Sequence, residues 1–512
     1  MPEARHREII MGTSIKTFAV AAAIALGIGS AQAATLRVGL QDDPDALDPA
    51  TSGTYTARIV FASMCDKLVD IDAKLNIVPQ LATAWAWNDK GTDVTFTLRS
   101  GVTFQDGTPF DAAAVKFNIE RMKTLKESNR KAELAPVDSV EVIDPTHVTF
   151  HLKGPFSPLL AVLSDRAGMM VSPTAVQKGG EFSANPVCSG PYKLKERKAR
   201  DSITLDKYPG YWNAAEIGYD QIQYLNIPDS TVRLSRLQAG DLDVAERIAP
   251  NDLASVRSDN KLALHSSPGL AVSHLMINVS NGDKAKSPIG ADPRLRKALE
   301  LSLDRNVINQ VAFNGEFIPD NQMIPPSSEY YSKSHAIPAR DIDKAKALIA
   351  EVGGPAPKIE ITFENSLTDG RVAQIIQSLA SEGGFEVDLL PLETTSAIQR
   401  YLAGDFQAYI GNWSGRADPD PTLYAFFGSD GSQNVNKYKN PEMDKTLVAA
   451  RQASDEATRK QLYESATDIY EADLSSIPLY HPNWFYASRA DVSGITIYPD
   501  GILRLTGVKP AK

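Results

Sequence analysis

A strand–helix–strand pattern in the second half of the sequence constrains the fold more than any other feature. Residues 358–363, KIEITF, alternate apolar and polar side chains, which is typical of a half-buried strand. Residues 370–384 carry apolar side chains at helical spacing and end beside Gly383, and residues 385–390 return to a strand pattern. Two strands joined through a helix are normally parallel neighbours in one sheet. The sequence therefore predicts the α/β fold class.

A further strand, residues 405–413, ends in the loop NWSGRADPDP. Ligands of open parallel sheets gather at the carboxyl ends of the strands. Arg371 is expected to begin the helix that follows residues 358–363, so it also lies at a carboxyl end. If both strands belong to one sheet, Arg371, Trp413 and Arg416 share an edge. Two guanidinium groups beside an indole suit a planar anion such as a carboxylate.

Each of these side chains also has an ordinary structural explanation. Trp413 could pack at a strand end, and Arg371 could be solvated at a helix start. Arg416 could form a salt bridge with Asp418 or Asp420 and only shape the loop. Both aspartates precede proline, a pair that commonly starts a turn. They resemble a fragment of a calcium loop, but the glycine and the late glutamate of that loop are missing, so no metal site is expected.

The first half of the sequence also mixes strands with helices. Residues 94–99 and 147–152 alternate as strands, and Asp111 is expected to cap a helix. His147 and His151 are four positions apart, a spacing that could hold a metal on a helix. On a strand this spacing separates them by about 13 Å, so both are predicted to be surface residues.

The first 33 residues have the pattern of a secretory signal peptide. Lys16 provides a positive flank, residues 17–30 are an apolar run, and AQA at residues 31–33 is a small-residue cleavage site. A buried apolar helix is the alternative. No cysteine follows the cleavage site, so no lipid anchor is expected, and the mature chain is predicted to be soluble and periplasmic. Translation could start at Met1 or at Met11.

The chain has two cysteines, Cys65 and Cys188. In an oxidising compartment such a pair favours a disulfide. Two buried free thiols are the alternative. Two cysteines alone do not supply the four ligands of a structural zinc site.

Charge and motifs argue against several functions. The formal net charge is −10 and no basic face is evident, so no nucleic-acid partner is expected. No phosphate loop or dinucleotide fingerprint occurs, and no cofactor is expected. Ser414 in GNWSG does not have the spacing of a nucleophile elbow. The sequence therefore does not predict an enzyme.

Several sequence blocks, spread in order over almost all of the expected mature chain, carry a family resemblance. They are CDKLVDIDAKLNIVPQLATAWAWNDKGTDVTFTLRSGVTFQDGTPFDAAAVKFNIERM, NPVCSGPYKL, YPGYWN, RLQAGDLDVA, DPRLRKALELSLDRNVI, DKAKALIAEVG and IPLYHPN. Together they resemble the extracellular solute-binding proteins of peptide (dipeptide/oligopeptide) ABC importers, bacterial family 5.

The resemblance implies a two-lobed periplasmic-binding-protein fold of type II, in the large peptide-binding class. Residues 34–278 and 485–512 would form the first lobe, with an inserted subdomain at about 83–185. Residues 279–484 would form the second lobe. Two connecting strands would be the hinge about which the lobes close on a ligand.

The resemblance also implies a ligand site. Arg371 matches an arginine that takes the ligand carboxylate in dipeptide binders. In those relatives an aspartate in the loop after the tryptophan pairs with the ligand amine, whereas Arg416 stands at that position here and Asp418 follows. This reversal of charge favours a ligand with an extra carboxylate, such as an acidic or modified peptide, a glutathione-like tripeptide or an opine-like conjugate. First-lobe positions near the cleft are matched by Thr54, Tyr55 and Arg166.

The implied function is the binding component of an importer. The protein would act as a monomer and deliver a peptide or peptide-like solute to a permease and ATPase complex in the inner membrane. An exported hydrolase on the same scaffold is one alternative, and a binder of other cargo, such as a metal chelate or haem, is another.

Overall fold

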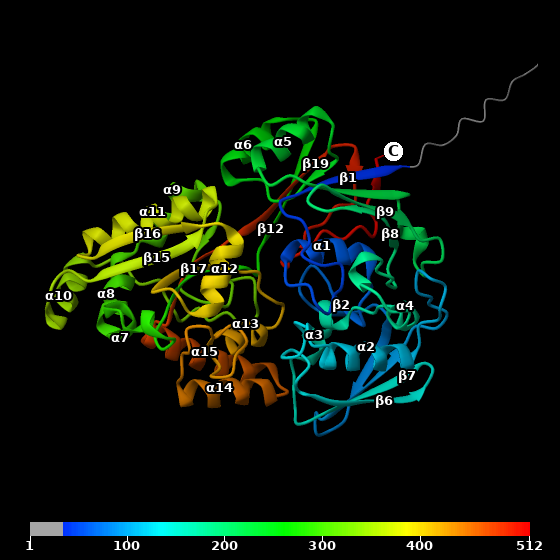
Figure 1. Cartoon of the computed structure of the whole chain (residues 1–512), viewed down its shortest axis with the longest axis horizontal. Coiled ribbons are helices and arrows are strands. Elements are labelled where there is room, and N and C mark those ends of the chain that lie inside the picture. Colours follow the sequence, from blue (N-terminus) through cyan, green and yellow to red (C-terminus); the bar gives the residue numbers. More distant parts are fainter. Residues whose placement is uncertain (1–33, 512) are drawn as a thin grey trace, which may run out of the picture. The chain divides into compact units, whose positions relative to one another are not determined.

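The structure is a computed structural model that describes residues 34–511. The predicted signal peptide and the question of its start, Met1 or Met11, lie outside the described residues. Within residues 34–511 no helix is long and apolar enough to cross a membrane. The strands of this range form three sheets of four or more strands and two small two-stranded sheets (Figure 1).

A seven-stranded sheet combines early and late segments of the chain. β1 (Thr35–Leu40) pairs in parallel with β10 (Gln221–Asn226) on one side and with β11 (Val244–Ala245) on the other. The alternating residues Leu36, Val38 and Leu40 of β1 are buried in the core beside this sheet. In spatial order the strands are β12 (Leu262–Pro268), β19 (Asn483–Arg489), β11 (Val244–Ala245), β1 (Thr35–Leu40), β10 (Gln221–Asn226), β9 (Ser202–Lys207) and β8 (Tyr192–Lys198).

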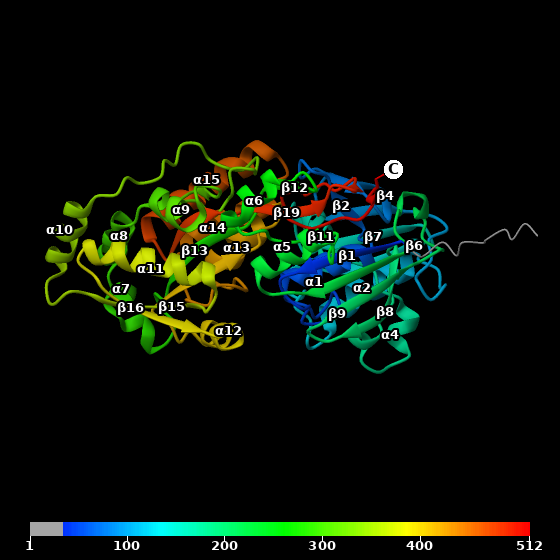
Figure 2. The ribbon, with the colours of Figure 1, turned by 90° about the horizontal axis from the view of Figure 1, so that it is seen from above.

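A six-stranded sheet contains the strand–helix–strand unit that the sequence predicts. β15 (Lys358–Glu364) and β16 (Glu386–Leu392) are parallel neighbours, and α11 (Leu367–Glu382) connects them and packs against both (Figure 2). That prediction is confirmed. β15 also pairs in parallel with β17, so both strands end at one edge of the sheet. In spatial order the strands are β14 (Ile318–Pro319), β18 (Ser476–His481), β13 (Val272–Ile277), β17 (Ala408–Trp413), β15 (Lys358–Glu364) and β16 (Glu386–Leu392).

A four-stranded antiparallel sheet lies in the segment expected as an inserted subdomain, with α2 (Ala112–Thr124) packed against it. The Asp111 carboxylate accepts a hydrogen bond from the Ala114 N–H at 2.9 Å, which confirms the predicted cap. His147 and His151 lie on β7 with side chains 40% and 37% exposed, so their assignment to a strand surface is also confirmed. The order is β4 (Ala82–Trp87), β5 (Asp93–Leu98), β7 (His147–Leu152) and β6 (Val137–Asp144).

The chain passes between the two large sheets at two places. β12 belongs to the seven-stranded sheet and β13 to the six-stranded sheet, and β18 and β19 make the reverse passage. We call the seven- and four-stranded sheets with their helices the first lobe, and the six-stranded sheet with its helices the second lobe. By sheet membership β13 belongs to the second lobe, although it precedes the expected boundary at residue 278. The division of the chain into these lobes stays a prediction.

Helices complete both lobes. In the first lobe the helices besides α2 are α1 (Tyr55–Met64), α3 (Leu159–Leu163), α4 (Pro173–Gln177), α5 (Ser230–Ala239) and α6 (Leu253–Ser258). In the second lobe the helices besides α11 are α7 (Pro288–Ala291), α8 (Pro293–Ser302), α9 (Arg305–Phe313), α10 (Ile342–Val352), α12 (Thr394–Ala403), α13 (Asp420–Phe427), α14 (Pro441–Gln452) and α15 (Glu456–Asp473).

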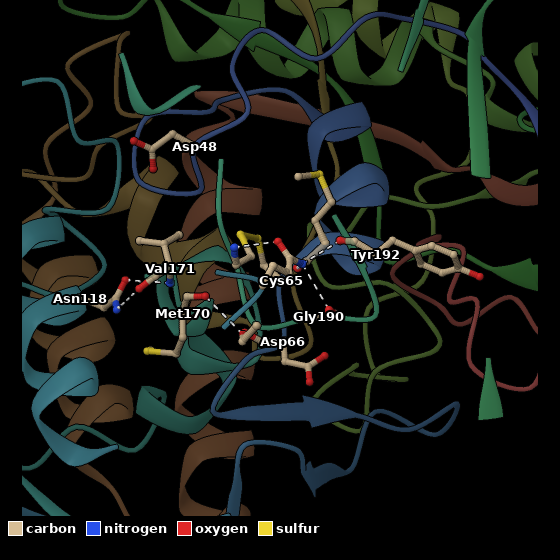
Figure 3. Close-up of a disulfide and its surroundings, with 12 residues drawn as sticks. Asp48, Cys65, Asp66, Asn118, Met170, Val171, Gly190 and Tyr192 are labelled. Atoms are coloured by element: carbon tan, nitrogen blue, oxygen red, sulfur yellow. Dashed lines mark hydrogen bonds between the residues drawn. A yellow bond between two sulfur atoms is a disulfide. The ribbon is translucent and has the colours of Figure 1, made fainter. Parts of the chain in front are cut away.

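A disulfide joins the segments that lead into and out of the four-stranded sheet (Figure 3). Cys65 follows α1 and Cys188 precedes β8, and their Sγ atoms are 2.00 Å apart. The side-chain amide of Gln105 donates to the carbonyl oxygens of Met64 at 2.8 Å and Tyr192 at 2.7 Å, so it ties the same two segments together. The two cysteines are separated by 123 positions, and the whole four-stranded sheet lies between them.

Candidate ligand site

The loop that leaves β17 turns at Gly415. Its φ of 68° lies in the left-handed region, and a Cβ there would stand 2.0 Å from the Leu270 carbonyl oxygen, so only glycine fits. Just before the turn, Trp413 donates its Nε1–H to Thr422 Oγ1 at 3.0 Å and packs edge-on against Phe426. The indole is therefore held by α13 while the chain reverses beside it.

His274 on β13 supports the same loop from within the sheet. Its ring lies edge-on to Phe426, with centroids 5.1 Å apart, and its Nδ1 is 2.6 Å from Ser476 Oγ. Gly411 on β17 leaves room for the imidazole, because a Cβ at that position would stand 2.9 Å from Nε2. Burial lowers the pKa of His274 to about 4, so the imidazole is neutral at pH 7.

Because His274 is buried and neutral, we expect the protein to lose stability in mild acid. Between pH values of about 6.5 and 4 the unfolded chain protonates His274 and the folded protein does not, so its contribution to stability falls as pH falls through this window. We expect His274→Gln to flatten this part of the dependence of melting temperature on pH. Thermal melts from pH 7 to pH 4 measure it, with the exposed His147→Gln as the control. The same slope in the parent and in His274→Gln would contradict the prediction.

Arg416 joins the loop to the first lobe through an ion pair. Its Nε is 2.9 Å from Asp165 Oδ2, and Arg58 Nε donates to the other carboxylate oxygen at 3.0 Å. The Arg416 guanidinium also lies 5.1 Å from the centroid of the Trp413 ring. Burial alone would raise the pKa of Asp165, but Arg58 and Arg416 hold it well below its usual range. A carboxylate of the protein thus lies between guanidinium groups from both lobes.

Arg166 is a buried cation beside this ion pair. The residue is 4% exposed, and its Nη1 donates only to the carbonyl oxygens of Ser52 at 3.1 Å and Thr54 at 3.3 Å. No carboxylate among residues 34–511 forms an ion pair with it. Burial is the largest cause that lowers the pKa of Arg166 to about 9, and the charge of the nearby Arg130 is the second. Burial also lowers the pKa of Arg416 to about 10. The cluster carries positive charge that its own carboxylates leave unbalanced.

Tyr55 extends this cluster into an aromatic wall. Its ring stacks on Trp484 with centroids 4.9 Å apart, and the guanidinium groups of Arg58 and Arg247 lie 5.8 and 4.7 Å from its centroid. Arg247 adopts a φ of 48°, which is uncommon for a residue other than glycine, and its Nε is 3.2 Å from the buried carboxylate of Glu246. A further arginine therefore lies beside the first-lobe part of the site.

The structure connects five of the seven predicted site residues. Arg416 contacts Trp413 directly, and Arg166 donates to the Thr54 carbonyl oxygen. Arg58 links the group, because it shares Asp165 with Arg416 and approaches the Tyr55 ring. The connected residues are Thr54, Tyr55, Arg166, Trp413 and Arg416. Their role toward a ligand stays a prediction.

The two aspartates of the loop are engaged inside the second lobe. Asp418 pairs with Arg459 at 2.8 Å, and Asp420 pairs with Arg451 at 2.9 Å. The alternative in which Arg416 pairs with one of these aspartates is therefore wrong. The carboxylate of Asp418 is buried and already paired, and its contact with a ligand stays a prediction.

Arg371 lies elsewhere than expected. α11 begins at Leu367, because Ser366 caps it by accepting a hydrogen bond from the Asp369 N–H at 3.0 Å. Arg371 is consequently in the second turn and not at the helix start. Its side chain is exposed and forms no hydrogen bond or ion pair with any of residues 34–511. The structure does not bring it into contact with Arg416.

Sequence reasoning missed Arg58, Asp165 and Arg247. Arg58 lies one turn after Thr54 in α1, and Asp165 directly precedes Arg166, so adjacency to predicted residues is the only sequence signal for either. Arg247 has no chemical motif around it. Its position depends on the contacts of β11 with distant strands.

A small cavity and the distribution of metal-ligating residues add no second site. A cavity of about 80 Å³ in the second lobe is lined by residues such as Lys297, Glu300, Tyr470 and Glu471, and by none of the predicted site residues. Within residues 34–511 no group of three or more His, Cys, Asp or Glu side chains is placed to hold a metal ion.

Comparison with known proteins identifies the family. Residues 76–434 match the family described as "Bacterial extracellular solute-binding proteins, family 5 Middle". The glutathione-binding protein GsiB of Salmonella paratyphi A (strain ATCC 9150 / SARB42) is 29% identical over 471 residues, which cover 89% of this chain and 90% of that protein.

Solved structures show the same fold. The periplasmic binding protein DppA of Helicobacter pylori, in complex with the peptide STSA, has a TM-score of 0.84 at 24% identity and covers 93% of this chain and 98% of its own. AgaA of A. tumefaciens R10, in complex with agropinic acid, has a TM-score of 0.82 at 23% identity, and the match covers 93% of this chain and 99% of AgaA. The expected α/β periplasmic-binding-protein fold is confirmed. The family consists of binding proteins and not of enzymes, so the hydrolase alternative is wrong, and the chain belongs to the bacterial extracellular solute-binding proteins of family 5.

Proposed function

We propose that this protein is the periplasmic substrate-binding component of an ABC importer and captures an acidic, peptide-like solute between its two lobes. One observation carries the proposal: Arg416 of the second lobe and Arg58 of the first share the Asp165 carboxylate, and the buried Arg166 lies beside them. A solute with a carboxylate would find donors from both lobes there. A permease and ATPase complex would then take up the solute.

The charge balance of the cluster supports an anionic ligand. Four guanidinium groups, those of Arg58, Arg130, Arg166 and Arg416, are accompanied by the carboxylates of Asp165 and Glu133. Arginine binds planar carboxylates through two parallel hydrogen bonds, and such pairs are strongest where water is excluded. An incoming carboxylate would therefore be stabilised more than a neutral or cationic group.

The placement of these groups on both lobes supports closure around the solute. A ligand that contacts both lobes binds the closed arrangement more tightly than the open one. It shifts the equilibrium toward closure by this difference in binding free energy. The two passages of the chain, between β12 and β13 and between β18 and β19, are the proposed hinge. Arg371, exposed beyond the end of β15 at the same sheet edge, remains a proposed second contact for a ligand carboxylate.

The names of two of the relatives agree with this ligand class. GsiB is named for glutathione, a tripeptide with two carboxylates, and AgaA was solved with agropinic acid. Both ligands are acids. We therefore propose an acidic peptide or an amino-acid conjugate as the solute, and monomeric action.

A binding and scattering experiment tests the proposal. Residues 34–512 are purified, and any ligand that co-purifies is identified by native mass spectrometry and then removed by partial unfolding and refolding. Glutathione is titrated by calorimetry beside its diamide, which has the same shape and no carboxylate, and beside trialanine. We expect stoichiometric binding of the acidic solute, a smaller radius of gyration at saturation and a higher melting temperature, because ligand binds only the folded state.

The outcomes separate the parts of the proposal. Equal affinity for glutathione and its diamide would refute the acidic ligand class. Saturation without compaction, measured by small-angle scattering, would refute closure between the lobes. A chromatographic search for cleavage products accompanies the titration, and none is expected from a binding protein.

A further inference from the structure

The segment from Phe156 to Arg166 of the first lobe contacts the second lobe at both of its ends. At its carboxyl end, Asp165 pairs with Arg416. At its amino end, the Ser157 N–H donates to the Arg451 carbonyl oxygen at 2.9 Å, and Ser157 Oγ donates to the Ala453 carbonyl oxygen. The short helix α3 separates these two contacts. The segment thus meets the second lobe at two points that a rigid element holds apart.

The loop that carries Arg416 is connected to the second of these points. It ends at Asp420, the first residue of α13, and the Asp420 carboxylate is 2.9 Å from Arg451 Nε. The Arg451 guanidinium lies 3.5 Å from the centroid of the Tyr424 ring and 5.1 Å from that of Phe156. Arg451 therefore touches the loop, α13 and the first lobe at once.

The chemistry of Arg451 suits such a connection. A planar guanidinium can pair with a carboxylate at its edge while its faces lie on aromatic rings. The Arg451 side chain is 19% exposed and that of Asp420 is 5% exposed, so water screens this pair little. The backbone carbonyl oxygens of Arg451 and Ala453 are at the end of α14, where carbonyl groups have no partner within the helix and accept hydrogen bonds from elsewhere.

We propose that Arg451 is a positioning residue for ligand capture: it couples the end of the Arg416 loop to Phe156 and Ser157, so that the loop takes its binding position when the lobes meet. This inference rests on the proposed function, and it names the residue that couples the ligand site to contact between the lobes. Arg451 touches no proposed ligand group, so its effect on binding would pass through Asp420 and the loop.

The test measures contact between the lobes without any ligand. Spin labels are attached at Lys126→Cys in the first lobe and Lys439→Cys in the second, both exposed positions, in protein whose native cysteines are bonded. We expect Arg451→Ala to move the distribution of label–label distances to longer values. Deuterium exchange at the Ser157 amide should become about tenfold faster, which is the effect expected when one coupled contact is lost. Lys445→Ala, an exposed change on the same helix, is the matched control.

A double-mutant cycle shows whether the effect passes across the lobes. The effects of Arg451→Ala and Phe156→Ala on the exchange rate of the Ser157 amide should not add up in the double variant. Arg451→Lys keeps the charge and loses the planar group, so it should recover only part of the parental protection of this amide. Unchanged distances and unchanged Ser157 exchange in Arg451→Ala would overturn the proposal. If Arg451→Ala does not fold, Ser157→Gly and Arg451→Lys provide the same two measurements.

The result is distinguishable from a failure of the proposed function. If glutathione does not bind and the lobe contact still depends on Arg451, the coupling stands and the ligand class is wrong. If glutathione binds to the parent and to Arg451→Ala with the same dissociation rate, Arg451 does not position the loop.

Discussion

Arg416→Ala is expected to weaken the binding of an acidic solute by about 2–5 kcal/mol, because a ligand carboxylate would lose its charged partner in a site that excludes water. The structure strengthens the reason for this expectation. The side chain of Arg416 is 11% exposed, and it forms its ion pair with a carboxylate of the other lobe and with neither aspartate of its own loop. Calorimetric titration of the parent and the variant with the same acidic solute measures the loss.

Thermal melting of the ligand-free proteins serves as the control for Arg416→Ala. The variant leaves Asp165 with Arg58 as its ion-pair partner, so some loss of stability is expected together with the loss of affinity. Arg294→Ala, which removes a half-exposed arginine of the second lobe, should change neither quantity. If Arg416→Ala melts at a lower temperature and keeps its affinity within a few-fold of the parent, Arg416 has a structural role only.

Removal of the disulfide is expected to have the second large effect. The double variant Cys65→Ser, Cys188→Ser should lower the free energy of unfolding by roughly 4–5 kcal/mol, because the bond closes a long loop in the unfolded chain. The 123-position separation contains the whole four-stranded sheet, so the unfolded chain gains much freedom when the bond is absent. Denaturant titration of the parent and the double variant measures this difference.

Thiol chemistry provides an independent measurement on the same bond. The parent should show no reactive thiol when it is denatured without reductant, and two after reduction. A single variant, Cys65→Ser, leaves Cys188 free and is the control for the labelling reaction. Two reactive thiols in denatured, unreduced parent would contradict the bond, and equal stability of the parent and the double variant would contradict its expected contribution.

The sequence by itself determined the elements whose physical causes are local. The alternation of Ile359, Ile361 and Phe363 and the helical spacing that follows specify β15 and α11, because both patterns reflect one buried face. Because α11 lies between β15 and β16, these two strands are parallel. That β17 joins the same sheet in parallel, so that the 413–420 loop leaves the same edge, was shown only by the structure. The cap at Asp111 follows from a side chain and a backbone amide three residues apart. The sequence blocks also identified the family, because a family resemblance depends only on which residues follow one another along the chain.

Only the tertiary structure decided which charges meet. Arg416 could pair with the aspartates beside it in the sequence, yet Asp418 and Asp420 are taken by Arg459 and Arg451 of later helices. Arg416 instead forms its ion pair with Asp165, which lies in the other lobe. A long side chain pairs with whatever charge the packed backbone brings within a few ångströms, and that distance depends on contacts between segments remote in sequence. Periodicity and spacing report on a residue's own element, so they contain no information about this choice.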